Sequence, residues 1–597
     1  MAFKELRHYY KIFRYYIGWR LYIVIALTIV ASVTEGLGIT LFLPLLNTAQ
    51  GTAHRSNSFA QHLVYQLLTR LSISHSLTGI LIFIAGVFVL KGIVKFAAES
   101  FEVVLQSDFL WDLKSGLFKL YNHVNYTYIL KRNTGHFVNV ITDQVNKFYH
   151  AFLAFLGLLT QLIQTLSYFA IAFALSWQFS SMALVMGLMV MFVFRFLTGY
   201  IQRFSRKISS EQSNLNNLLV QGLQALKYII STGQSSKINK GIDSSIRRLT
   251  DAIRRAGIAH GLTTASSEPI IIVMIAGIII IQVNGFHQSL TPVFVSVILF
   301  YKGAQSLLNI QNYLQKMAIH IGAVEMVNGE FEILRKNQEE RSGKQVGRLK
   351  KSIIFEDVSL AYQDDDPAVL KGINFDIPAN ATIALVGKSG AGKSTLADTL
   401  TLMLKPQHGR ILIDGLDSRN LDIISWRKQI GYVSQETKIF DDTVANNISL
   451  WSGEYDSDET LQKAILRAAE KAFAHEFISE LPDGYQTRVG DRGIMLSGGQ
   501  RKRLFIAREL FKEPSLLVLD EATSSLDGQS ERYVQESIDK MKGALTVVII
   551  AHRLSTVKRA DQIYVLDKGK IIEKGSYEEL LCQDKSLFKE MVEIQSL

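Results

Sequence analysis

A glycine-rich stretch near residue 390 has the residue types that bind phosphate. The sequence ALVGKSGAGKSTL fits the pattern G-x-x-x-x-G-K-[ST], with Gly387, Gly392, Lys393 and Ser394 at the defined positions. An apolar strand pattern, TIALV, precedes it, and a helical pattern, STLADTLTLML, follows it. The glycines let backbone N–H groups converge on phosphate oxygens, the lysine reaches the outer phosphates, and the serine hydroxyl can bind Mg²⁺. The motif therefore predicts a nucleotide-binding loop between a strand and a helix.

Two adjacent acids end a second apolar strand pattern. In SLLVLDEATSSLD the strand ends in Asp520, and Glu521 follows it. Beside a phosphate-binding loop, the first acid can hold Mg²⁺ through water, and the second can orient or deprotonate an attacking water. Alone, the pair would be a charged turn after a buried strand. The phosphate-binding loop in the same chain favours the catalytic interpretation.

A third motif, LSGGQ, comprises Leu496 to Gln500 and precedes the helical pattern RKRLFIAREL. A hydroxyl and two glycines at a helix N-terminus can form a second anion site, although Ser-Gly-Gly also starts ordinary capped helices. With this motif, residues 351–597 closely resemble the nucleotide-binding domain of ATP-binding cassette (ABC) transporters, in which LSGGQ is the signature. The resemblance implies an α/β P-loop ATPase domain with ATP and Mg²⁺ as cofactors.

The same resemblance assigns roles to single positions. It implies that Glu521 polarises the attacking water, that His552 in IIAHRLS contacts the γ-phosphate, and that Gln435 in GYVSQE senses Mg²⁺ and water. The implied metal ligands are Ser394, Gln435 and, through water, Asp520. The implied ATP-binding residues are Tyr362, Gly387, Lys388, Ser389, Gly390, Ala391, Gly392, Lys393, Ser394, Thr395, Ser497, Gly498, Gly499, Gln500 and Asp527.

The composition indicates a membrane protein of more than one domain. The chain has 597 residues, of which 48% are hydrophobic, and the apolar residues concentrate in the first half. Six segments are long and apolar enough to cross a bilayer, at 20–46, 77–99, 151–175, 179–200, 265–285 and 291–311. The single cysteine, Cys582, excludes an intrachain disulfide framework and a cysteine-based zinc cluster.

The basic residues follow the expected topology. The two long connections, between spans two and three and between spans four and five, are rich in Lys and Arg, whereas the short connections have few or none. The positive-inside rule places the long connections, both termini and the ATPase domain in the cytoplasm, which in a bacterium means an inner-membrane protein. Because this distribution accounts for the net charge of +10, nucleic acid is not an expected partner.

Helical extensions and a surface helix complete the expected architecture. The first twenty residues predict an amphipathic helix on the cytoplasmic membrane surface. The long connections predict cytoplasmic extensions of the spans, with short helices near 123–132 and 225–234 that end at Gly135 and Gly233. The expected domains are a membrane domain at 1–325, a linker at 326–350 and the ATPase domain at 351–597.

Six spans followed by one nucleotide-binding domain resemble an ABC exporter half-transporter. In this family ATP lies between the phosphate-binding loop of one domain and the signature of another, and this chain has one of each. The resemblance therefore implies a homodimer with two competent sites, while a heterodimer stays open. ATP binding would close the cytoplasmic domains, and the short helices would transmit that closure in an alternating-access cycle.

The first span contains an acid within an apolar run. In TEGLGITLFLPLL, Glu35 is followed nine residues later by Pro44, an arrangement that resembles the first span of flippases for lipid-linked oligosaccharides. Glu35 is expected to face the translocation cavity, with Lys302 of span six as its partner or as a second lining residue. Packing against a neighbouring helix is the alternative role for Glu35, since Gly36 and Gly38 allow close helix contact.

Several functions remain open at the level of sequence. The expected activity is ATP-driven export or flipping of an amphipathic substrate such as a lipid or a lipid-linked oligosaccharide. A multidrug or peptide exporter is one alternative, and an ATP-gated channel or regulatory ATPase without cargo is another. An importer would typically need a separate binding protein and separately encoded membrane subunits.

Overall fold

The protein is described from a computed structural model. The structure describes residues 3–50, 66, 68–70, 77–132, 134–175, 177–286, 290–339, 342–362, 366–522, 528–551, 553–583 and 585–596. These form two compact units, an N-terminal unit (Met1–His123 with Asn133–Lys336) and a C-terminal unit (Val124–Arg132 with Asn337–Leu597). The predicted domain boundaries, a membrane domain at 1–325, a linker at 326–350 and an ATPase domain at 351–597, stay a prediction. The two compact units differ from these domains because residues 124–132 group with the C-terminal unit.

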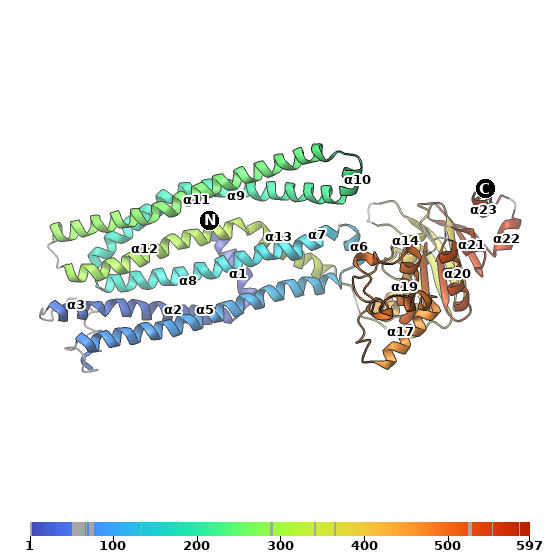
Figure 1. The fold of residues 1–597 in the computed structure, drawn as a ribbon, viewed down its shortest axis with the longest axis horizontal. Helices are drawn as coiled ribbons and strands as arrows, with labels where there is room; N and C mark the ends of the chain where they lie inside the picture. The colour runs from blue at the N-terminus through green and yellow to red at the C-terminus, as the bar shows by residue number, and fades with distance from the viewer. Residues whose placement is uncertain are drawn as a thin grey trace. The chain divides into compact units, whose positions relative to one another are not determined.

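The N-terminal unit consists of helices (Figure 1). In chain order its elements are α1 Phe3–Ile17, α2 Arg20–Thr40, α3 Phe42–Gln50, α5 Leu77–Tyr121, α7 Thr134–Asn139, the π-helical turn η1 Val140–Gln144, α8 Val145–Leu175, α9 Trp177–Gln224, α10 Leu226–Ser231, α11 Ser235–Phe286, α12 Leu290–Ile319 and α13 Ile321–Lys336. Figure 1 shows α9 and α11 as long helices side by side, with the short helix α10 at the turn between them. Helices α2, α5, α8 and α12 pack together in the same unit.

Three stretches of the described chain are long and apolar enough to cross a membrane. They are Arg20–Leu46, Leu77–Tyr121 and Gly135–Leu175, and they contain the first three predicted spans. The other three predicted spans lie in α9, α11 and α12, and α11 contains the shorter apolar stretch Glu268–Ile281. On α5, side chains such as Val89 and Phe96 are exposed by 64% and 72%, which fits a surface that lipid covers.

The predicted surface helix is present as α1, but its apolar face packs against protein. Tyr9, Phe13 and Ile17 follow one another at intervals of four and are at most 5% exposed. The ring of Phe13 lies 6.3 Å from that of Phe109 on α5 and 4.8 Å from that of Phe155 on α8. Burial in this aromatic cluster therefore explains the amphipathic pattern.

Both predicted short helices are present, as α6 (Tyr126–Leu130) and α10. Gly233 has a φ of +67° just after α10, as expected of a helix-ending glycine. The prediction for Gly135 is wrong, because this residue lies inside α7 and α6 already ends at Leu130. A glycine inside a helix costs only about 1 kcal/mol, so it marks a helix end unreliably.

The C-terminal unit is built on two sheets. Its elements beside α6 are β1 Ser352–Leu360, β2 Leu370–Pro378, β3 Thr382–Gly387, α14 Lys393–Leu400, β4 His408–Ile413, β5 Leu416–Asp417, α15 Ile423–Arg427, β6 Ile430–Val433, α16 Val444–Ser449, α17 Glu459–Lys471, α18 His475–Ser479, α19 Gly498–Phe511, β7 Leu516–Asp520, α20 Gly528–Met541, β8 Thr546–Ile550, α21 Leu554–Val557, β9 Gln562–Asp567, β10 Lys570–Gly575, α22 Tyr577–Cys582 and α23 Leu587–Ser596, with 3₁₀ turns at Ser418–Asn420, Gly484–Gln486 and Asp491–Gly493. A six-stranded sheet has the order β10-β9-β3-β8-β7-β6, and a four-stranded antiparallel sheet has the order β2-β1-β4-β5.

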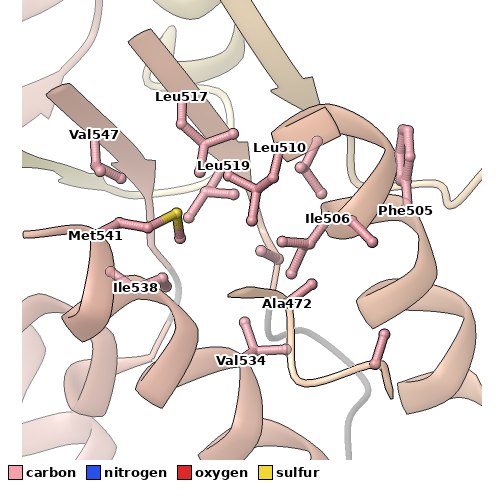
Figure 2. Packing of buried hydrophobic residues seen from close by; sticks show 14 of the residues in the cluster. Ala472, Phe505, Ile506, Leu510, Leu517, Leu519, Val534, Ile538, Met541 and Val547 are labelled. Carbon is pink, nitrogen blue, oxygen red and sulfur yellow. The ribbon is translucent and has the colours of Figure 1, made fainter. Parts of the chain in front are cut away.

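Both faces of the six-stranded sheet are buried. Successive side chains of a strand point to opposite faces, so β3, β7 and β8 supply two separate hydrophobic clusters. One cluster contains Ile383, Leu385, Leu516, Val518, Val548 and Ile550, and the other contains Ala384, Val386, Leu517, Leu519, Val547 and Ile549. In Figure 2, Ile506 and Leu510 of α19 and Ile538 and Met541 of α20 lie toward Leu517 and Leu519, and Phe505 and Val534 belong to the same cluster. This packing fixes α19 against the strand that ends in Asp520.

Candidate functional site

The carboxyl ends of five parallel strands, β9, β3, β8, β7 and β6, meet at one edge of the six-stranded sheet. Strand β3 pairs with β8, β8 with β7 and β7 with β6, all in parallel. Ligands of open α/β sheets bind at this edge. The edge collects the predicted loop after β3, the acids at the end of β7, and Gln435 just beyond β6.

The predicted phosphate-binding loop has the backbone that its glycines permit. Gly387, Gly390 and Gly392 have φ angles of +153°, +79° and +102°. A Cβ atom on Gly387 would lie 2.2 Å from the carbonyl oxygen of Leu566 on the neighbouring strand β9. Only glycine therefore fits where β3 turns into the loop.

Lys393 begins α14 and turns back across the loop. Its Nζ donates to the carbonyl oxygens of Gly387 at 2.8 Å and Lys388 at 3.1 Å, and the residue is only 6% exposed. Burial lowers the pKa of Lys393, and the nearby carboxylates of Glu521 and Asp520 oppose that shift. The side chain is thus a buried cation held by backbone carbonyls at the sheet edge.

The other residues of the phosphate-binding loop fall into a buried group and an exposed group. Ala391 and Thr395 are buried, whereas Lys388, Ser389, Gly390 and Ser394 are exposed. The exposed residues line the outer side of the loop, where a nucleotide would approach. The hydroxyl of Tyr362 lies 2.9 Å from Oγ1 of Thr395, so the structure brings these two predicted ATP-binding residues together.

The predicted catalytic acid and the predicted sensor glutamine are in contact. Nε2 of Gln435 donates to Oε2 of Glu521 at 2.8 Å. Glu521 has a φ of +47°, a conformation that L-residues other than glycine rarely adopt, and its N–H donates to the carbonyl oxygen of Ile550. Such strain is common at functional sites. Asp520, one residue earlier, is 8% exposed.

The signature residues form a capped helix start. Oγ of Ser497 accepts from the N–H of Gln500, and the N–H of Ser497 donates to Oε1 of Gln500, which is a capping box. A Cβ atom on Gly499 would lie 2.0 Å from Oγ of Ser530 on α20, so a glycine is required for close packing there. Gly498 has open space beside it. Two predicted site residues, Asp527 and His552, lie outside the described residues.

A second candidate site lies in the N-terminal unit and includes both predicted cavity residues. Nζ of Lys302 is 2.5 Å from Oε1 of Glu35. The same carboxylate oxygen is 3.0 Å from Nζ of Lys91, and Tyr168 donates its hydroxyl to Oε2 at 2.9 Å. Four helices, α2, α5, α8 and α12, thus meet at one carboxylate.

This cluster borders a cavity of about 400 Å³. Its lining includes three lysines and three glutamates, four amide side chains and four hydroxyls, namely Lys91, Lys95, Lys302, Glu35, Glu99, Glu102, Gln161, Gln164, Gln305, Asn309, Thr28, Thr160, Tyr168 and Ser306. Oγ1 of Thr160 is buried and has no hydrogen-bond partner among the described residues.

Glu35 and Lys302 were predicted from the sequence as cavity residues, whereas Lys91 and Tyr168 had no predicted role. Lys91 is a charge in a predicted span, which is itself a signal of function. Tyr168 carries no comparable signal, because a tyrosine in an apolar helix is common and its contact with Glu35 joins residues far apart in the chain. Among the described residues, no group of three or more His, Cys, Asp and Glu side chains could hold a metal ion.

The fold and the phosphate-binding loop at the sheet edge define a P-loop ATPase joined in one chain to a helical membrane region. Two family models match, "ABC transporter transmembrane region" over residues 21–302 and "ABC transporter" over residues 370–524. The chain belongs to the ABC transporter family, and its predicted fold class is confirmed.

Relatives match over most of the chain. An "ATP-dependent lipid A-core flippase" of Mannheimia succiniciproducens is 32% identical over 83% of this chain and 84% of the relative. The "Heterocyst differentiation ATP-binding protein HepA" of a Nostoc species is 32% identical over 80% of this chain and 78% of the relative. A solved bacterial Atm1-family ABC exporter with ATP bound shares the fold, with a TM-score of 0.74 and 24% identity over 97% of this chain and 99% of that one. The chain is therefore an integral membrane protein with a transport-coupled ATPase.

Proposed function

We propose that this chain is an ATP-driven flippase for a lipid with a large polar headgroup rich in hydroxyls, such as a glycolipid. The observation that carries the proposal is the lining of the cavity of about 400 Å³. Its three lysines balance its three glutamates, so the lining favours no net charge on the ligand, and its amides and hydroxyls are suited to hydrogen-bond sugar hydroxyls. The unpartnered hydroxyl of Thr160 supplies one such group. Relatives named lipid A-core flippases support the same substrate class.

The test is flipping in proteoliposomes with two fluorescent probes that share their acyl chains. One probe carries an oligosaccharide headgroup, and the other is phosphatidylglycerol. The proposal expects ATP-dependent flipping of the glycolipid, with little flipping of phosphatidylglycerol. Equal flipping of both probes, or of a cationic drug in preference to either, would favour a general amphipath exporter. An ATP-gated ion current without flipping would favour the channel alternative.

The proposed hydrolysis assigns one task to each residue at the sheet edge. Lys393 and the loop amides bind the phosphates, and Tyr362 stacks on the base. Glu521 accepts the proton of the attacking water, Gln435 orients Glu521 and water, and His552 contacts the γ-phosphate. Ser394, Gln435 and, through water, Asp520 would hold Mg²⁺, since hydroxyl, amide and carboxylate oxygens are the ligands that this hard cation prefers. Bound there, the ion would neutralise charge on the phosphates.

The proposed assembly is a homodimer. The chain has one phosphate-binding loop and one signature, and each would complete a site with a second copy. The surface of α10 supports this, because Leu226, Tyr228 and Ile230 are exposed by 46%, 67% and 67%. In the C-terminal unit, a cavity of about 780 Å³ bordered by Thr437, Ile439 and Phe440 could receive such a helix from the second copy.

We propose that α6 and α10 transmit closure of the ATPase domains to the spans.

Thiol cross-linking tests the homodimer. In a Cys582→Ser background, Tyr228→Cys and Thr437→Cys are introduced on separate chains and treated with a short bifunctional thiol reagent. The proposal expects a covalent dimer only when both chains are present. A control pair uses Lys463→Cys in place of Thr437→Cys, because Lys463 is exposed and does not border the cavity. Equal cross-linking with the control would contradict this assembly.

We propose that the C-terminal unit lies in the cytoplasm and that, in a bacterium, the protein lies in the inner membrane. The Lys and Arg residues of the two long connections support it. In inside-out vesicles the C-terminal unit should be open to protease, whereas in right-side-out vesicles it should be protected.

A further inference from the structure

Lys502 is a buried lysine on the signature helix α19. It is 4% exposed, and its Nζ donates to the carbonyl oxygens of Ser434 at 2.9 Å and Gln435 at 3.5 Å. A buried ammonium needs partners, and these lie on the backbone just beyond β6. The side chain therefore ties α19 to the segment that carries Gln435.

The same segment carries the contact to the predicted catalytic acid. Nε2 of Gln435 lies 2.8 Å from Oε2 of Glu521. Burial lowers the pKa of Lys502 to about 8, and the carboxylates of Asp520 and Glu521 oppose that shift, so the ammonium lies within the electrostatic reach of both acids. The geometry forms a chain of contacts from α19 through the backbone of Gln435 to Glu521.

We propose that Lys502 is a positioning residue for hydrolysis, which holds the backbone at Ser434 and Gln435 so that the Gln435 side chain stays on Glu521. This inference rests on the proposed roles of Glu521 and Gln435. The N-terminus of α19 would contact the nucleotide bound mainly by the second copy, whereas Lys502 contacts the site of its own chain. Lys502 thus links the two nucleotide sites through one helix.

The first test measures backbone protection without nucleotide. Hydrogen exchange is compared among wild type, Lys502→Met, Lys502→Arg and Lys463→Met in lipid nanodiscs. Met keeps the apolar stem and loses the donor, Arg keeps a donor, and Lys463 is an exposed control on α17. Lys502→Met should speed exchange of the peptide around 433–438 on the order of ten-fold, the effect of losing one charged hydrogen bond. Lys502→Arg should restore part of the protection, and Lys463→Met should change nothing.

Unchanged exchange in the peptide around 433–438 would overturn the proposal. So would equal acceleration throughout the C-terminal unit, because that result indicates a general structural role. If Lys502→Met does not fold, Lys502→Gln replaces it, and the same two outcomes decide.

The second test is a double-mutant comparison of ATPase rates. Lys502→Met and Gln435→Ala should each lower kcat, and the double variant should be little worse than Gln435→Ala alone, because Lys502 acts through Gln435. ATP affinity, measured separately, should be unchanged by Lys502→Met, since Lys502 acts on the Gln435–Glu521 pair and not on the phosphates. Fully multiplicative losses in kcat, or a loss of ATP affinity, would overturn the inference.

The two proposals fail in distinguishable ways. If Glu521→Gln hydrolyses ATP at the wild-type rate, the proposed catalytic site is wrong. If Glu521→Gln is inactive and Lys502→Met turns over normally, only the inference about Lys502 is wrong.

Discussion

Glu521 combines an unusual backbone conformation with a specific partner. Its φ of +47° aims the carboxylate from the end of β7, and Gln435 donates to it at 2.8 Å. Such a conformation costs about 1–3 kcal/mol and is retained where the surroundings require it. These features support a catalytic role.

We predict that Glu521→Gln binds ATP and hydrolyses it about 10²–10⁴-fold more slowly, which is the usual contribution of a general base. The side chain keeps its size and loses its charge. Rapid-quench assays with bound nucleotide would measure the rate, and the closed dimer should accumulate. Near-normal turnover would remove Glu521 from the catalytic role.

Lys393 differs from Glu521 because it should act before the chemical step. We predict that Lys393→Ala weakens ATP binding by about 10–100-fold, as expected for the loss of charged hydrogen bonds, and lowers hydrolysis with it. Equilibrium binding of a fluorescent ATP analogue measures the first effect. Unchanged affinity would contradict the assignment.

Glu35 is the shared acidic partner of two lysines in the N-terminal unit. Its carboxylate is shared by Lys91 and Lys302, at 3.0 Å and 2.5 Å. We predict that Glu35→Gln lowers the ratio of substrate-stimulated to basal ATPase and lowers transport, because the two ammonium groups lose their shared counter-charge in the cavity. Asp108→Asn, at an exposed carboxylate of the same unit that pairs with Arg20 and does not border the cavity, is the matched control. Normal transport by Glu35→Gln would leave only the packing role.

Motifs that are continuous in the chain could be predicted from the sequence, whereas contacts between distant elements could not. The phosphate-binding loop could be located because its chemistry depends on residues adjacent in the chain. The contacts of Lys91, Tyr168 and Lys502 could not, because each joins elements distant in sequence and depends on which helix faces which. Positions can be identified from the sequence as candidates, but their partners require the fold.

At the scale of elements, the turn from β3 into α14 depends on two glycines with different surroundings. A Cβ on Gly387 would lie 2.2 Å from the carbonyl oxygen of Leu566, whereas one on Gly390 would have no heavy atom within 4 Å. Both residues have positive φ. Alanine substitutions at these two positions therefore distinguish the energetic cost of a steric clash from the cost of backbone strain.

We predict that Gly390→Ala lowers the free energy of unfolding by about 1–2 kcal/mol, the cost of a left-handed residue with a side chain. Gly387→Ala should lower it by more, because the neighbouring strand β9 must also move. Thermal unfolding without nucleotide compares the two variants. Equal destabilisation would show that the contact with Leu566 has no energetic effect.

Element ends were harder to predict than elements. The sequence indicated both short helices, the strand before the phosphate-binding loop and the helix after it. It misplaced one helix end at Gly135, and it did not indicate the π-helical turn Val140–Gln144. The amphipathic pattern of α1 indicated a helix but not the surface that it packs against, since aromatic protein and lipid both accept the same apolar face.

At the scale of the whole molecule, each composite site should need two chains. Chains with Lys393→Ala and chains with Ser497→Ala should each be nearly inactive as homodimers. In a mixed dimer, the intact loop of one chain meets the intact signature of the other. Equal mixing makes half of the dimers mixed, so about a quarter of the sites should be intact if the sites act independently.

Steady-state ATPase after mixing in detergent and reconstitution measures this recovery, and mass spectrometry confirms the exchange of chains. No recovery despite exchange would contradict either the shared sites or their independence.

The grouping of residues 124–132 with the C-terminal unit means that this unit is not one continuous length of chain. The N–H of Asn125 donates to the carbonyl oxygen of Asn337, and Tyr126 packs against the hydrophobic cluster that contains Ile353 and Leu385. A gene fragment that begins near residue 337 would encode a protein with that patch uncovered. Such a fragment is expected to be less soluble than one supplied with a peptide of residues 122–133. Exchange of this domain between related transporters would likewise have to include the loop.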